Sequence, residues 1–86
     1  MPVPPAELTA EFTIHPFEEG HMQPHVRAGV DAARATGLAI EVGPLGTGLS
    51  GARDDVLRAL NDVMVAALDA GARAVHVKVE APSEAR

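Results

Sequence analysis

Along this 86-residue sequence the spacing between apolar residues switches repeatedly between two positions and three or four. A period of two is typical of a strand with one buried face, and a period near 3.6 is typical of an amphipathic helix. From the N-terminus, the switches predict a strand (7–14), a helix (22–36), a strand (38–42), a weaker glycine-rich strand (45–50), a helix (53–70) and a strand (74–80). This order of strands and helices is compatible with only a few folds.

With short connections and right-handed crossovers, this order of strands and helices predicts a ferredoxin-like βαββαβ arrangement. We therefore expect an α+β sandwich, with a four-stranded antiparallel sheet and two helices on one face. Pro24 is tolerated only in a first helical turn, and Gly37 and Gly71 are the expected helix ends. A loop with capping residues is predicted at 50–54. The domain is expected to span 7–80, with a disordered segment at 1–6 and a polar tail at 81–86.

Strand alternation separates the residues expected under the helices from those on the open side of the sheet. Leu8, Ala10, Phe12 and Ile14 are expected to face the helices, as are Val75, Val77 and Val79. The open face then carries polar and small residues: Thr9, Glu11, Thr13, His15, Glu41, Gly46, Gly48, Ser50, His76, Lys78 and Glu80. Such a face is either simply solvated or a site for a ligand or a protein partner.

Composition excludes several functional classes. The absence of cysteine excludes disulfides, thiolate metal sites and cysteine nucleophiles. A net charge of −5 and only two aromatic residues argue against a nucleic-acid partner. No apolar run approaches the roughly 20 residues that cross a bilayer, and the N-terminus lacks the pattern of a signal peptide. We therefore expect a cytoplasmic protein without a membrane partner.

The histidines offer a possible metal site. His21 and His25 are four residues apart near a predicted helix start, so we expect them to share one helical face, with His15 as a candidate third ligand. Pro24 interrupts this turn, however, and there is no HExxH motif. The favoured interpretation is that these histidines hold no physiological metal and that the protein needs no cofactor.

Several short motifs follow one another along the chain: Ala10–Phe17, Gly37-Leu38, Pro44–Gly51, Asp54-Asp55-Val56, Gly71-Ala72-Arg73, the strand 75–80 and the tail 81–86. Taken in this order, they resemble the thiamine-binding protein family, which includes the YkoF-type thiamine/hydroxymethylpyrimidine-binding proteins. The resemblance covers roughly residues 7–86, and one position departs from it, because Ser50 stands where the family usually has an acidic residue.

The resemblance implies a ferredoxin-like module that binds thiamine or its hydroxymethylpyrimidine moiety without catalysis, as a carrier or sensor. It also implies a homodimer or homotetramer. The residues that we predict to contact the ligand are Glu11, Thr13, His15, Phe17, Gly46, Thr47, Gly48 and Ser50.

Each of these assignments has a plainer alternative. Thr47 is equally an ordinary strand threonine, Phe17 is favoured as a residue that closes the core, and Glu11, Thr13 and His15 are equally solvent residues. No nucleophile–base pair or phosphate loop stands out, so an enzyme is not expected. Two further functions remain open: a structural or regulatory module that binds protein through the open sheet face, and a metal-binding protein that uses the histidines.

Overall fold

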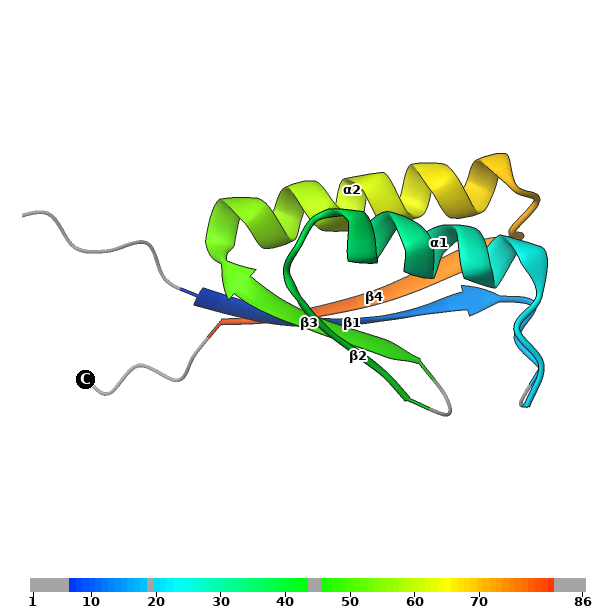
Figure 1. Ribbon diagram of the computed structural model, residues 1–86, viewed down its shortest axis with the longest axis horizontal. Coiled ribbons are helices and arrows are strands. Elements are labelled where there is room, and N and C mark those ends of the chain that lie inside the picture. The colour runs from blue at the N-terminus through cyan, green and yellow to red at the C-terminus, as the bar shows by residue number, and fades with distance from the viewer. Residues whose placement is uncertain (1–6, 19, 44–45, 82–86) are drawn as a thin grey trace, which may run out of the picture.

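A computed structural model describes residues 7–18, 20–43 and 46–81. Their strands form one antiparallel sheet in the order β2-β3-β1-β4, and both helices lie on the same face of it (Figure 1). The elements are β1 (Glu7–His15), α1 (Pro24–Ala35), β2 (Ala39–Val42), β3 (Thr47–Ala52), α2 (Arg53–Asp69) and β4 (Ala74–Glu80). This is the predicted ferredoxin-like α+β fold. The disordered segment predicted at 1–6 lies outside the described residues, as does the polar tail predicted at 81–86 apart from its first residue, Ala81.

β1 is a central strand, paired with β3 on one side and β4 on the other. Its alternate residues Leu8, Ala10, Phe12 and Ile14 are all buried under the helices, as the period of two predicts. Phe12 lies opposite Thr47 of β3 and Val77 of β4, so these three side chains share the helix-facing side.

α1 begins at Pro24 and ends through a threonine and a glycine. The Thr36 hydroxyl donates to the Ala33 carbonyl at 2.6 Å and accepts from the Leu38 amide at 3.2 Å. Gly37 then takes a φ of +80°, as expected for a left-handed residue at a helix end. The start predicted near Met22 or Gln23 is a residue or two early: Gln23 is the N-cap, and Pro24 stands in the first turn as expected, because proline is favoured at the first helical position. Met22 lies before the helix and is partly exposed.

α2 follows β3 directly, and the predicted loop at 50–54 is therefore wrong. β3 continues to Ala52, and α2 begins at Arg53 with Ala52 as its N-cap and no side-chain cap. Ser50, considered as a possible capping residue, is instead paired in the sheet between Thr9 and Ala39. Asp54 and Asp55 stand in the first turn, where carboxylates complement the helix dipole.

The helices pack closely because their facing residues are small. Ala33, Ala59 and Ala67 are almost fully buried. A Cβ added at Gly29 would collide with Ile14 of β1, so glycine sets the distance between α1 and the sheet.

β4 is an edge strand, and the helices cover it only in part. Val77 and Val79 face the helix side, as expected, but they remain 38 % and 41 % exposed. Two helices span the central strands of a four-stranded sheet more fully than its edges. None of the helices in the described part of the chain combines the length and apolar character needed to span a bilayer.

Candidate functional site

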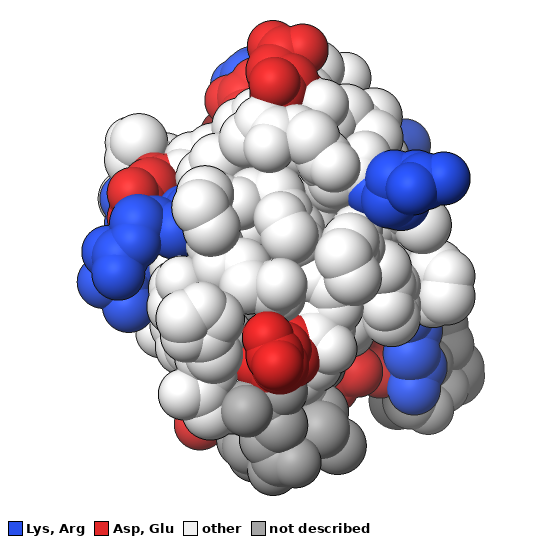
Figure 2. Space-filling view, turned by 90° about the vertical axis from the view of Figure 1, so that its right-hand side faces the viewer, with Lys and Arg blue, Asp and Glu red and all other residues white. Residues whose placement is uncertain are grey.

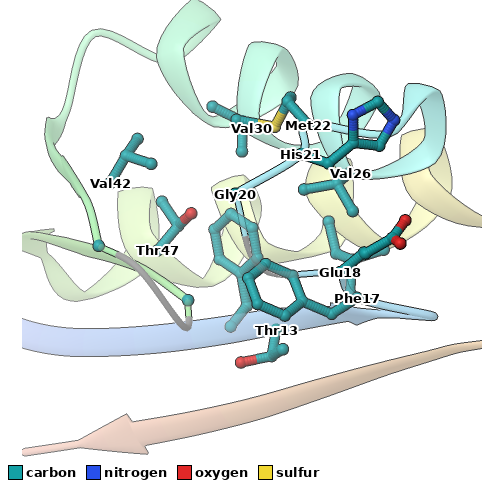
Figure 3. Close-up of a pocket in the computed structure, with 14 residues that line it drawn as sticks. Thr13, Phe17, Glu18, Gly20, His21, Met22, Val26, Val30, Val42 and Thr47 are labelled. Atoms are coloured by element: carbon teal, nitrogen blue, oxygen red, sulfur yellow. The ribbon is translucent and has the colours of Figure 1, made fainter.

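A cavity of about 330 Å³ lies between α1 and one end of the sheet (Figure 3). It forms where β1 ends, β2 leads into β3, and the segment from Pro16 to Gln23 crosses to α1. Its lining residues are Phe12, Thr13, Ile14, Phe17, Glu18, Gly20, His21, Met22, Val26, Val30, Val42, Gly43, Gly46 and Thr47. Its size falls at the lower end of the range for small-molecule pockets.

The inner wall of this cavity is apolar with one buried hydroxyl group. Phe12 and Ile14 from β1 and Val26 and Val30 from α1 are buried core residues. Thr47 is the buried polar residue among the described residues, with 5 % of its surface exposed. Its hydroxyl points into the space between β3 and the Phe17 ring (Figure 3) and has no hydrogen-bond partner within the described chain. A ligand that offers a hydrogen bond there would give this hydroxyl a partner.

The segment from Pro16 to Gln23 forms the rim of the cavity, and two contacts fix its position before α1. The His21 amide donates to the Glu18 carbonyl at 3.2 Å, and Gly20 has a φ of +81°, which suits glycine in a tight turn. The His25 Nε2 lies 2.7 Å from the Pro16 carbonyl oxygen and ties α1 to the end of β1. Phe17, which is half-buried, is thereby held over the cavity (Figure 3).

The charge around the cavity favours a neutral or cationic ligand. Glu18 is the charged side chain among the described lining residues, which include no lysine or arginine. Figure 2 views the end of the molecule where β1 ends and α1 begins, and it shows scattered charges around a broad uncharged surface. The net charge of the protein, −5, is negative like the Glu18 side chain, so it also favours a cationic ligand over an anionic one.

A second, open hollow lies on the other face of the sheet, over Gly48 of β3. Gly48 is flanked by Glu11 of β1 and Glu41 of β2, which pair with it on either side. The two hollows share the lining residues Thr13, Val42, Gly43, Gly46 and Thr47. They therefore meet at the end of the β2–β3 hairpin.

The structure gathers most of the residues predicted to bind a ligand around two adjoining hollows: four of the eight line the cavity under the helices and five line the second hollow, with Thr13, Gly46 and Thr47 in both. Thr13, Phe17, Gly46 and Thr47 line the cavity under the helices. Glu11, Gly48 and Ser50 line hollows on the open face, and His15 packs there against His76. Neighbouring strand residues face opposite sides of the sheet, so Thr47 faces the helices and Gly48 the open side, although both border the second hollow.

The structure changes the interpretation of two predicted ligand-binding residues, Gly46 and Phe17. A Cβ at Gly46 would lie 2.9 Å from the Thr13 Oγ1 and 3.0 Å from the Phe12 carbonyl oxygen, so close packing of β3 on β1 already requires glycine there. Phe17 packs against the core and also lines the cavity, so both of its proposed roles are realised together.

The expected shared helical face of His21 and His25 is also wrong, because α1 begins only at Pro24 and His21 precedes it. Among the described residues, no group of three or more histidine or acidic side chains is placed to hold a metal ion.

The sequence interpretation missed most of the apolar lining. The predicted ligand set contained neither Val26 and Val30 of α1 nor Glu18, Met22 and Val42, and His21 was considered only as a possible metal ligand. No local signal marked Val42, which reaches the cavity only through the pairing of β2 with β3.

Comparison with known proteins gives a family and a fold. The family model described as thiamine-binding protein matches residues 10–84. No curated protein matches the chain.

Three solved structures are similar over 92 % of the chain. A domain of unknown function from Bacillus cereus is 24 % identical, with 77 % of that chain covered and a TM-score of 0.71. A hypothetical protein from Methanocaldococcus jannaschii is 20 % identical, with 81 % covered and a TM-score of 0.69. A Thermotoga maritima protein with a proposed role in thiamine biosynthesis or salvage is 14 % identical, with 85 % covered and a TM-score of 0.55. At these identities the likeness shows a shared fold.

Proposed function

Because the chain belongs to the thiamine-binding protein family, whose model spans residues 10–84, we propose that it binds thiamine or its hydroxymethylpyrimidine moiety in the cavity under α1. The role is that of a carrier or sensor, and the ligand leaves chemically unchanged. The observation that carries the proposal is the cavity itself: an apolar space of about 330 Å³ with one buried hydroxyl and an aromatic ring at its mouth.

The aminopyrimidine ring suits this cavity by shape and polarity. It is flat, so it can lie against the Phe17 ring while its other surface contacts Val26 and Val30. Its ring nitrogens and amino group supply hydrogen-bonding groups for the buried Thr47 hydroxyl.

The charge distribution supports thiamine over its phosphate esters. The thiazolium ring of thiamine carries a positive charge, and Glu18 stands at the rim. Glu11 and Glu41 lie on the open face, where the second hollow joins the cavity. A phosphate group would need lysine, arginine or a cluster of backbone amides, and the described lining includes no lysine or arginine. We therefore expect weaker binding of thiamine diphosphate than of thiamine.

The proposal of binding without catalysis follows from the polar groups of the cavity. Glu18, His21 and Thr47 are not joined to one another by side-chain hydrogen bonds. A nucleophilic mechanism requires a hydroxyl within hydrogen-bond reach of a base that a third group orients. Within the described lining, Thr47 has no such base.

Calorimetric titration with thiamine, hydroxymethylpyrimidine and thiamine diphosphate tests the ligand. We expect saturable binding of one of the first two and weaker binding of the diphosphate. Thr47→Val removes one hydrogen bond worth about 1 kcal/mol and should weaken binding about fivefold. Thr9→Val is the matched control, because Thr9 is an exposed threonine on the open face of β1.

Two results would contradict this assignment. One is the absence of heat from thiamine and hydroxymethylpyrimidine at millimolar concentration with folded protein. The other is an equal loss of affinity in Thr47→Val and Thr9→Val. The open sheet face as a protein-binding surface would then be the better interpretation.

We also propose that the protein is a homodimer formed along β4. This edge strand leaves backbone groups unpaired, and it exposes Val77 and Val79 beside the sheet. Antiparallel pairing of two copies about Val79 would place Lys78 of each opposite Glu80 of the other. Two cross-strand ion pairs and contact between the exposed valines would then support the dimer.

A charge exchange tests this arrangement by light scattering. Lys78→Glu should shift the protein toward monomer, because it sets like charges opposite each other. The double variant, Lys78→Glu with Glu80→Lys, should restore the dimer. A monomeric parent at micromolar concentration would contradict the proposal, as would a double variant that dissociates as readily as Lys78→Glu.

A further inference from the structure

Two histidines from adjacent strands meet on the open face of the sheet. The imidazole rings of His15 on β1 and His76 on β4 have centroids 4.5 Å apart and are inclined by 54°. His76 lies opposite Thr13, and His15 lies opposite Ala74, so the two histidines are diagonal neighbours on one face. Such neighbours are within reach of each other's side chains.

The nitrogen atoms of both rings are uncommitted within the described part of the chain. Neither ring takes part in a hydrogen bond or ion pair there, and His76 is exposed while His15 is half-buried. His25, by contrast, has its Nε2 engaged at 2.7 Å from the Pro16 carbonyl oxygen.

We propose that His15 and His76 form a two-histidine site for a borderline divalent transition-metal ion, Cu²⁺, Ni²⁺ or Zn²⁺, with water completing the coordination. Imidazole nitrogen suits these three ions, whereas Mg²⁺ and Ca²⁺ prefer oxygen ligands. The hydrogen-bonded backbones of β1 and β4 fix the positions of both Cβ atoms. Binding therefore has to order only the side-chain torsions of two residues that already touch.

The charges beside this pair are nearly balanced. Lys78 follows His76 on the same face, and it lies opposite Glu11 and 3.7 Å from the Glu80 carboxylate. An approaching cation is therefore not opposed by an isolated positive side chain on this part of β4.

The site is separate from the cavity under α1. His15 and His76 are not among the cavity-lining residues, and they face the side of the sheet away from the helices. Metal binding and ligand binding should therefore be independent, and the metal site stands whether or not the ligand assignment holds.

Nuclear magnetic resonance of the four histidine rings tests the site on the intact chain. Substoichiometric Ni²⁺ should broaden the imidazole signals of His15 and His76 before those of His21 and His25. Zn²⁺ should shift the same two signals with 1:1 saturation, and Mg²⁺ should shift none. His76→Gln should weaken Zn²⁺ binding roughly tenfold or more, since one of two protein ligands is lost. The matched control, His21→Gln, should leave the affinity unchanged.

The opposite pattern overturns the proposal. Equal broadening of all four rings would mean unselective binding to exposed imidazoles, and an equal loss in His21→Gln would place the ion elsewhere. His15→Gln provides an independent variant of the same pair, and circular dichroism of each variant verifies folding. An unchanged Zn²⁺ affinity in both His15→Gln and His76→Gln would also refute the site.

Discussion

Replacing Gly29 with alanine probes how tightly α1 packs onto the sheet. A Cβ at this position would collide with the Ile14 Cδ1, whereas the next neighbours, Val63 Cγ1 and Ala67 Cβ, lie at 3.5 and 3.6 Å. Overpacking of a core costs about 1–3 kcal/mol. Alanine regains about 1 kcal/mol of helix propensity over glycine. We therefore expect Gly29→Ala to lower the free energy of unfolding by up to about 2 kcal/mol.

A second substitution should relieve this collision. Ile14→Val removes Cδ1, and alone it should cost about 0.5–1.5 kcal/mol, because it leaves a small void in the core. In the double variant the alanine methyl group enters that void, and its nearest remaining side-chain neighbour is Val63 Cγ1 at 3.5 Å. The double variant should consequently be close to the parent in stability, with a favourable coupling of about 1–2 kcal/mol between the two sites.

Urea denaturation followed by circular dichroism measures all four proteins of this double-mutant cycle. The reasoning depends on direct contact between the two side chains. Additivity of the two single losses within about 0.5 kcal/mol would show that they do not interact and would refute it.

Other substitutions test the core, a helix end and the surface charges in the same assay. Leu60→Ala should cost about 2–5 kcal/mol, because Leu60 lies on the buried face of α2, whereas Leu68→Ala, at a residue 53 % exposed, should change stability by less than about 1 kcal/mol. Gly37→Ala should cost about 1–2 kcal/mol despite open space around it, because its φ of +80° strains an L-residue; an unchanged urea midpoint would contradict this. Arg58→Ala should change stability by less than about 1 kcal/mol, because its ion pair with Asp55 is exposed at 3.6 Å.

The local pattern of the sequence was sufficient for the kinds of elements and their order. A buried face with period two marked β1, and the three-to-four spacing of Val56, Leu60, Val63 and Ala67 marked α2. Gly37 and Gly71 marked the helix ends because their positive φ angles are a local property of the chain. The boundary between β3 and α2 was predicted wrongly, because serine is common both at helix N-caps and in loops. In the structure Ser50 is instead paired within the sheet.

The candidate site depended on contacts between residues far apart in the chain. Alternation correctly placed Thr47 under the helices and Gly48 on the open face, yet the resemblance grouped them as one ligand set. Only the packing of α1 on β1, together with the pairing of β1 with β3, shows that Thr13, Phe17, Gly46 and Thr47 border one cavity. The sequence does not distinguish the apolar wall of the cavity from the core, because core residues and pocket residues have the same hydrophobic character.

The histidines show the same division between local and long-range information. Their spacing in the sequence drew attention to His21 and His25, which a helix beginning at Pro24 keeps from sharing a helical face. The pair in ring contact, His15 and His76, is 61 positions apart, and only the antiparallel register of β1 and β4 brings it together. Hydrophobic periodicity is a short-range property that the sequence determines by itself. Strand register and the coverage of the sheet by helices arise from the packing of the whole chain, so the tertiary structure alone decided which polar side chains meet.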